Sequence, residues 1–161
     1  YYPVADKVTL VGRVIGGHSE GWGGDDVRLL DLFFRGGETI RGFDRSGFGP
    51  RDARTGDSLG GQTFWAATTE LRFPIPFIPD ELGMGAAVFA DAGSLFNASG
   101  RAKAVVDPGD LLDDSTVRSS VGGSILWNSP VGPLRVDFAH ALTKEDYDDE
   151  QFFRFGASTK F

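Results

Sequence analysis

The sequence predicts an all-β chain in which six long antiparallel meander strands form part of a transmembrane β-barrel wall. Three observations predict this fold class: apolar and polar residues alternate with a period of two, the alternating segments are long, and short connections alternate with long ones. Most segments exceed the ~5–6 residues usual for globular strands, and about 9–11 alternating residues suffice to cross a bilayer. The expected strands occupy residues 4–17, 62–73, 82–96, 117–128, 134–142 and 151–161.

Composition excludes several classes of protein. The chain has 161 residues, enough for one domain or part of one, and a formal charge of −7, which leaves no basic stripe for nucleic acid. It has no Cys and only two His, which excludes a disulfide framework, a thiolate zinc site and a His-rich metal site. No apolar run approaches the ~18–20 residues of a spanning helix. Residues 1–10 also lack the charged start and apolar stretch of a signal peptide.

In the first two expected strands, one face is apolar or small and the other is mixed or polar. At 4–17, Leu10 and Val14 point away from Arg13. At 62–73, the apolar face carries Trp65, Ala67, Leu71 and Phe73, and the polar face carries Thr68, Glu70 and Arg72.

The next two expected strands combine small residues with isolated polar groups on one face. At 82–96, Asp91 shares its face with Phe89, opposite Val88. At 117–128, Val121, Ile125 and Trp127 lie opposite Arg118, Ser120, Ser124 and Asn128.

The last two expected strands alternate most clearly. At 134–142, Val136 and Phe138 face away from Asp137. At 151–161, one face carries Phe153, Phe155, Ala157, Thr159 and Phe161, and the other carries Arg154, Gly156, Ser158 and Lys160.

The connections also favour a membrane barrel. Two are short and stiffened by proline, at 74–79 and 129–133, whereas those at 18–61, 97–116 and 143–150 are longer and polar. Outer-membrane barrels sort their connections in this way, with short periplasmic turns and longer outer loops. A soluble β-sandwich binding module has no reason to do so, and it remains the rival from another class. A detergent-free monomer would favour the sandwich.

A connection as long as 18–61 is uncommon unless it is functional or disordered, and its glycine-rich first part, residues 21–26, could be a flexible surface loop. Its middle part, residues 32–43, contains apolar and aromatic side chains that need burial. The nearest surface able to bury them is the interior of the barrel, so we expect this loop to fold into the lumen.

Three segments resemble one family of outer-membrane proteins. Residues 35–43, which include Ile40-Arg41-Gly42-Phe43, resemble the lumen-loop signature of the POTRA-transporter superfamily, which inserts or secretes proteins through a 16-stranded barrel. Residues 129–137 resemble the turn and penultimate strand of the same superfamily, and residues 150–161 resemble the last strand of the BamA family. The resemblance implies the C-terminal part of a BamA-family barrel, without the earlier strands or the soluble periplasmic repeats.

Arg41 is the first candidate site residue. A guanidinium in a lumen loop requires carboxylate partners, and the alternation places Glu70 and Asp91 on inward faces of the following strands. The resemblance implies the same clasp, with Gly42 allowing a tight turn and Phe43 packing on the wall. The alternative is an exposed arginine in a mobile loop, whose ion pairs would contribute little.

Phe153, Phe155 and Phe161 form the second candidate site. A terminal aromatic residue on an alternating strand resembles the C-terminal signal that the assembly machinery recognises in barrel proteins. These residues could equally be ordinary lipid-facing side chains and an interface anchor, and both interpretations stay open. The resemblance also implies that the last strand takes part in a lateral gate, where a client strand adds to the sheet edge.

The resemblance implies a non-enzymatic factor that assembles and inserts proteins in the bacterial cell outer membrane. The acidic runs at 110–114 and 146–150 match no catalytic or calcium pattern and are expected to be solvated, so we expect no catalytic residue, metal or cofactor. The alternative within the superfamily is a translocation or secretion pore. Expected partners are outer-membrane lipid, client β-barrel proteins, lipoproteins of the machinery (mainly through the absent periplasmic domains), and other copies through open sheet edges, with no nucleic acid.

Overall fold

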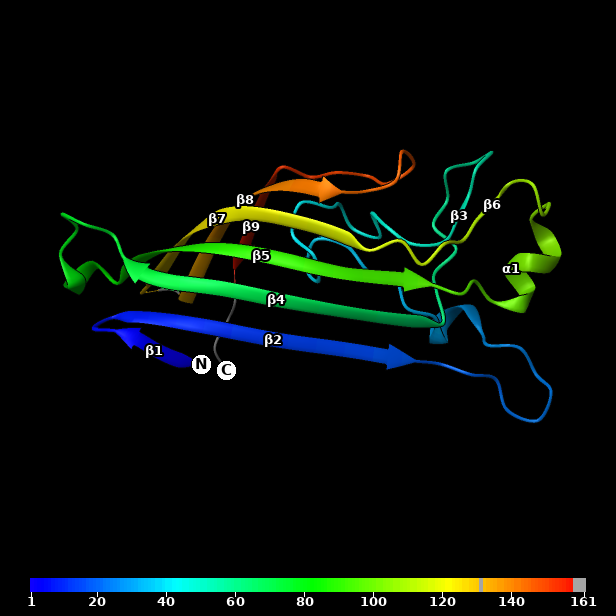
Figure 1. The fold of residues 1–161 in the computed structure, drawn as a ribbon, viewed down its shortest axis with the longest axis horizontal. Helices are drawn as coiled ribbons and strands as arrows, with labels where there is room; N and C mark the ends of the chain where they lie inside the picture. Colours follow the sequence, from blue (N-terminus) through cyan, green and yellow to red (C-terminus); the bar gives the residue numbers. More distant parts are fainter. Residues whose placement is uncertain (131, 158–161) are drawn as a thin grey trace.

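A computed structural model describes residues 1–130 and 132–157. Its main feature is a curved antiparallel sheet with strand order β1-β2-β4-β5-β7-β8-β9, so each strand lies beside the next strand of this sheet along the chain (Figure 1). The strands are β1 (Tyr2–Ala5), β2 (Val8–His18), β4 (Thr63–Pro74), β5 (Met84–Phe96), β7 (Arg118–Ser129), β8 (Gly132–Thr143) and β9 (Phe153–Ala157). The all-β meander predicted from the sequence is confirmed.

The first strand differs from the expectation. The range 4–17 was expected to be one strand, but it contains the end of β1, a tight turn and most of β2. Lys7 takes a positive φ of 59° in this turn, which folds Tyr2 back beside Leu10. The main sheet therefore has 7 strands rather than six. The described part of the last strand ends at Ala157, and residues 158–161, with Phe161, lie outside the described residues.

Smaller elements occupy the connections. Strands β3 (Arg51–Asp52) and β6 (Leu111–Leu112) pair with each other and join the long loop to the loop between β5 and β7. In the part of the chain that the structure describes, the helical elements are α1 (Gly100–Val105) and two single 3-10 turns at Leu29–Asp31 and Asp80–Leu82. Among the described residues, no helix has both the length and the apolar character needed to cross a bilayer.

The sheet exposes apolar side chains on its convex face and buries polar side chains on its concave face, which is the reverse of a soluble protein. Phe153 and Phe155 are 51% and 59% exposed on the convex face, where Val14, Ile125 and Phe138 are also exposed. The concave face instead buries charged and hydroxyl groups: Glu70, Asp91, Ser120, Ser124 and Asp137. A soluble protein buries its apolar groups, so this arrangement, in one curved sheet, contradicts the β-sandwich alternative and fits a membrane wall.

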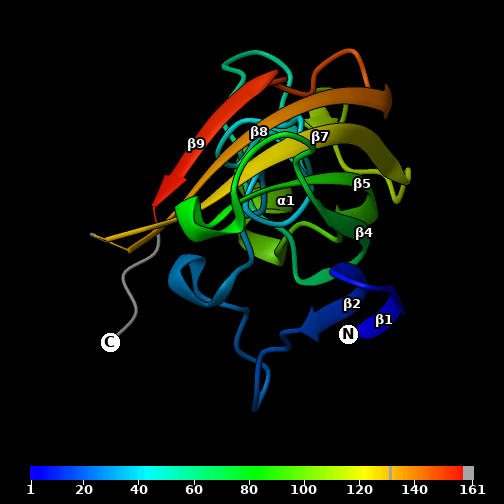
Figure 2. The same cartoon turned by 90° about the vertical axis from the view of Figure 1, so that its left-hand side faces the viewer.

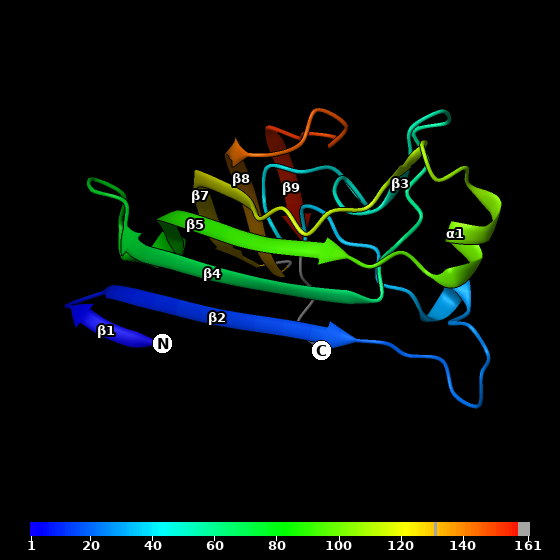
Figure 3. The same cartoon turned by 45° about the vertical axis from the view of Figure 1, so that its right-hand side comes forward.

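The hydrophobic core lies between the concave face and the long loop. Figure 2 shows the sheet arching around the loop, and Figure 3 shows the loop beside β7, β8 and β9. The core consists of buried residues from the loop and from the inner faces of the strands: Ile40, Phe43, Phe48, Phe64, Ala66, Leu95 and Ala141. The loop residues that needed burial are therefore packed on the strands.

Candidate functional site: a loop arginine on the sheet wall

A tight turn presents the Ile40–Phe43 segment to the sheet. The backbone N–H groups of Thr39 and Ile40 both donate to the Gly36 carbonyl, at 2.8 and 3.0 Å. Ile40 and Phe43 are fully buried, and the Phe43 ring packs edge-on against Phe48 with centroids 5.4 Å apart. These two apolar anchors hold the intervening residues against the wall.

Arg41 binds two carboxylates on neighbouring strands. Its Nε and Nη2 each donate to Asp91 of β5 at 2.7 Å, and its backbone N–H donates to the same carboxylate at 3.0 Å. Its Nη1 donates to Glu70 of β4 at 2.5 Å. The guanidinium also lies over the Phe89 ring, 3.4 Å from the centroid. The structure thus brings together Arg41, Glu70 and Asp91, with the bidentate geometry that a guanidinium favours.

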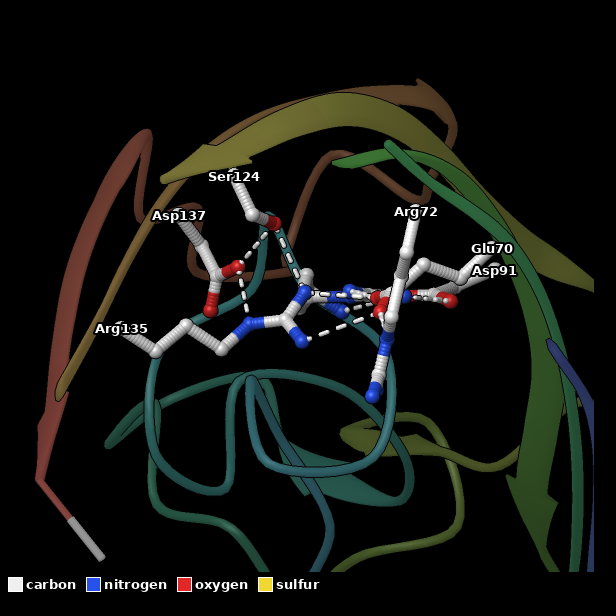
Figure 4. Close-up of polar contacts among 7 residues, drawn as sticks. Glu70, Arg72, Asp91, Ser124, Arg135 and Asp137 are labelled. Atoms are coloured by element: carbon white, nitrogen blue, oxygen red, sulfur yellow. Dashed lines mark hydrogen bonds and ion pairs between the residues drawn. The ribbon is translucent and has the colours of Figure 1, made fainter. Parts of the chain in front are cut away.

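Glu70 is shared by three arginines. Besides Arg41, it accepts from Arg72 Nε at 2.7 Å and from Arg135 Nη2 at 2.7 Å. Figure 4 shows Arg72 and Arg135 approaching Glu70 from different sides of the curved wall. The carboxylate therefore links the long loop to β4 and β8.

The network continues from Arg135 along the inner wall. Arg135 Nε donates to Asp137 at 2.6 Å, and Arg135 Nη2 donates to the Ser124 hydroxyl at 2.7 Å (Figure 4). Ser124 in turn donates to Asp137 at 2.5 Å. Four residues of this network were not among the site residues expected from the sequence: Arg72, Ser124, Arg135 and Asp137. Their positions on polar faces of the alternating segments were the available signal.

Burial makes this network energetically important. The side chains of Arg41, Glu70 and Asp91 are 11%, 4% and 1% exposed. Burial lowers the pKa of the Arg41 guanidinium, but its hydrogen bonds to Asp91 and Glu70 outweigh this effect and raise that pKa above its usual value. Removing one partner from a buried pair leaves an uncompensated charge, which is strongly destabilising.

Two glycines allow the close approach of the loop and the wall. Gly42 has a φ of +95°, and a Cβ there would lie 3.3 Å from the Ser120 Cβ. Gly122 pairs directly with Phe89 across β5 and β7, and a Cβ there would lie 2.5 Å from the ring. A side chain at either position would disturb the seat of Arg41.

A second buried arginine lies where β7 begins. Arg118 and Asp148 have fully buried side chains, and Arg118 Nε donates to Asp148 at 2.9 Å. Arg118 Nη2 also donates to the Tyr147 hydroxyl at 3.0 Å, and Tyr147 donates to Asp114 at 2.7 Å. The interpretation of both acidic runs as solvated loops is therefore wrong for Asp148, because Arg118 supplies a buried partner.

The terminal aromatic residues lie apart from the Arg41 site. Phe153 and Phe155 are exposed on the convex face, with Phe153 5.5 Å from Phe138 between ring centroids. Phe161 lies outside the described residues. Within the described residues, β9 has β8 on one side and no strand on the other.

Comparison with known proteins places this geometry in a family. The entire chain, residues 1–161, matches the Omp85 superfamily domain. The chain belongs to the Omp85 superfamily. It is 35% identical over 162 residues to the outer membrane protein assembly factor BamA of Neorickettsia risticii, covering 100% of this chain and 21% of that relative. It is also 40% identical over 74 residues to the human sorting and assembly machinery component 50 homolog, covering 43% of this chain and 15% of the relative.

A solved structure agrees with this assignment. BamA from Haemophilus ducreyi lacking POTRA domains 1–3 matches with a TM-score of 0.81 and 28% identity, covering 95% of this chain and 32% of that chain. The prediction that this Omp85 chain is the C-terminal part of a BamA-family barrel in the bacterial outer membrane is confirmed. The chain spans 21% to 23% of the length of two BamA relatives, which are named as outer membrane protein assembly factors.

Proposed function

We propose that this chain is the barrel part of a non-enzymatic factor that assembles and inserts outer-membrane proteins. In this proposal, the Ile40–Phe43 segment is docked in the barrel lumen and β9 is the last strand at a lateral gate. The docking of Arg41 on Glu70 and Asp91 carries the proposal, because it fixes a long loop inside the wall at a buried and specific site.

The sheet edge supports the proposed mode of action. A strand edge with free N–H and C=O groups can accept another strand by β-augmentation. In the described part of the chain, β9 has one such edge, and its convex face presents Phe153 and Phe155 to the surroundings. We infer that a client strand adds at this edge while lipid contacts the aromatic face. This action requires no cofactor or covalent chemistry.

The proposed partners follow from this mode of action. They are client β-barrel proteins at the edge of β9, outer-membrane lipid on the convex face, and lipoproteins of the machinery that bind mainly outside this chain. Phe153, Phe155 and Phe161 would also serve as the chain's own assembly signal. Open edges of the isolated chain would favour self-association.

The test replaces Arg41 in the full-length parent protein. Arg41→Ala removes every side-chain hydrogen bond of the docked loop to Glu70 and Asp91. We expect lower levels of folded client barrels in cells that depend on the variant, and faster protease cleavage within residues 18–61. Folded clients are measured by their heat-dependent mobility on gels.

The matched control is Arg28→Ala in the same loop. Arg28 is exposed and pairs only with Asp31 among the described residues, so its loss should change neither readout. Normal client levels and normal loop cleavage in Arg41→Ala would remove Arg41 from the mechanism.

A further inference from the structure

The segment that leads into β9 is hydrogen-bonded to the arginine loop. Gln151 N–H donates to the Gly42 carbonyl at 3.0 Å, Asp44 N–H donates to the Asp149 carbonyl at 2.9 Å, and Asp149 N–H donates to the Gly47 carbonyl at 2.8 Å. These bonds join residues 42–47 to residues 149–151, and we call them the loop–strand ladder. Figure 3 shows the connection from β8 to β9 lying over the long loop.

The ladder leads directly to the last strand. Phe43 and Glu150 form an antiparallel bridge within it. One residue after the ladder, the Phe152 carbonyl accepts from Ala139 N–H of β8 at 2.9 Å, and β9 begins at Phe153. The backbone that follows Arg41 is therefore hydrogen-bonded to the segment that directly precedes β9.

Arg51 holds this ladder from the side. Its side chain is 7% exposed, and its Nη1 lies 2.7 Å from Oδ2 of Asp149, whose side chain is 60% exposed. Its Nη2 donates to the Ser46 carbonyl at 2.8 Å, and its Nη1 donates to the Gly56 carbonyl at 3.0 Å. One planar guanidinium thus connects a carboxylate of the ladder with two carbonyls of the long loop, which a lysine could not do from the same position.

We propose that Arg51 is a positioning residue for the last strand. By holding Asp149 next to Ser46, it fixes the loop–strand ladder, so that the docked arginine loop and the start of β9 move as one body. This inference rests on the proposed function, because the position of β9 matters to clients only if β9 forms the gate. The competing interpretation is that Arg51 only closes its own turn at residues 51–56.

Hydrogen exchange of the full-length parent protein in detergent micelles separates these interpretations. In Arg51→Ala, we expect about tenfold faster exchange in peptides covering 42–47 and 149–157, the size expected for losing a charge-assisted bond. Asp149→Asn keeps the backbone of the ladder but removes the carboxylate charge. Because Asp149 is 60% exposed and solvent screens its ion pair, this variant should accelerate exchange in the same peptides but to a smaller extent, and the double variant should match Arg51→Ala.

A second variant disturbs the loop–strand ladder without changing Arg51. A Cβ at Gly47 would lie 2.6 Å from the Asp149 carbonyl oxygen, so Gly47→Ala should also accelerate exchange in 149–157. Gly12→Ala is the control for this variant, because a Cβ there meets nothing within 4 Å. Arg54→Ala is the control for Arg51, because Arg54 is exposed and its ion pairs are at 3.7 and 3.9 Å.

Two results would overturn the proposal. One is faster exchange in Arg51→Ala confined to residues 46–56, and the other is unchanged exchange of 149–157 in Asp149→Asn. Client assembly measured in Arg41→Ala tests the proposed function separately. Normal assembly there, with coupled exchange in the Arg51 and Asp149 variants, would reject the function and retain the coupling.

Discussion

Arg41 and Arg118 are both buried arginines, but they connect the loops to the sheet in opposite ways. Arg41 belongs to a loop, and its carboxylate partners, Glu70 and Asp91, belong to central strands. Arg118 belongs to a strand, and its side-chain partners include Asp148 and Tyr147 of a loop.

This difference determines what each arginine can stabilise. The partners of Arg41 stand on paired strands, so the backbone that carries Glu70 and Asp91 is held in place by the sheet. The partners of Arg118 lie outside the strands, and besides the arginine only loop groups bond them: Glu145 bonds Asp148, and Asp114 bonds Tyr147, among the described residues. We therefore expect damage at the Glu70 cluster to affect the whole barrel, and damage at Arg118 to affect mainly the loops.

The largest effect is expected from Glu70→Ala. The change leaves the nearly buried Arg41 and the partly exposed Arg72 and Arg135 without their shared carboxylate, so the three guanidinium groups repel one another. We expect the free energy of unfolding of the parent barrel to fall by about 3–5 kcal/mol, measured by denaturant unfolding in detergent. Thr69→Ala, at an exposed neighbouring position, is the control. A loss as small as that of the control would refute the role of Glu70 as the hub.

Arg118→Ala should have a smaller and more local effect. It removes bonds to Asp148 and Tyr147 but leaves the strand pairing of β7 intact. We expect a loss of about 2 kcal/mol, with new protease cleavage in residues 144–149 before any change in the core strands. If residues 144–149 are cleaved only when the core strands also unfold, Arg118 and Arg41 stabilise the barrel in the same way and the contrast between them fails.

Tyr147→Phe should reveal the same cluster through its pH dependence. Burial, and then the hydrogen bond donated to Asp114, raise the pKa of the Tyr147 hydroxyl above its ordinary value of about 10. Because the folded-state pKa is the higher one, this stabilisation is complete below about pH 10 and is lost as the pH rises through the folded-state pKa. Protection of the loop from protease should therefore decrease in alkali.

In Tyr147→Phe, loop protection should already be weaker at pH 8, by about 1 kcal/mol, and its alkaline decrease should disappear. Tyr2→Phe serves as the control, because Tyr2 is exposed. An alkaline decrease that persists in Tyr147→Phe would assign the titration to another group.

The smallest effect is expected from Lys7→Ala. Lys7 and Asp80 form an ion pair between two turns, but both side chains are more than half exposed. Solvent screens such a pair, so the unfolding midpoint should not change measurably. A clear shift of the midpoint would mean that exposed pairs also fix the turns, which would weaken the contrast with the buried arginines.

The period-two alternation predicted which residues share each face of the sheet. It placed Glu70 and Asp91 on the face where both are buried, since side chains alternate strictly along a strand. It could not predict that Arg72 and Arg135 both reach Glu70. That contact depends on the curvature of the sheet across several strands and on long flexible side chains.

Two other features could not be predicted from local pattern. Strand β1 is 4 residues long, too short for alternation to be recognised, and its turn relies on a lysine in a left-handed conformation. The burial of Asp148 depends on Arg118, which is 30 residues away in the sequence. Acidic residues in a polar loop are usually solvated, so only the folded chain reveals this pair.

The pairing of Gly122 with Phe89 has a consequence for how this wall can vary. The Phe89 ring lies between Gly122 and the Arg41 guanidinium, so the space that Gly122 leaves free determines where the ring and the guanidinium lie. A methyl group at 122 would lie 2.1 Å from the Phe138 carbonyl oxygen and 2.5 Å from the Phe89 ring, so it would strain the β7–β8 pairing and press the ring toward Arg41. A smaller side chain at 89 would relieve only the second of these contacts, because the first is with the backbone of β8.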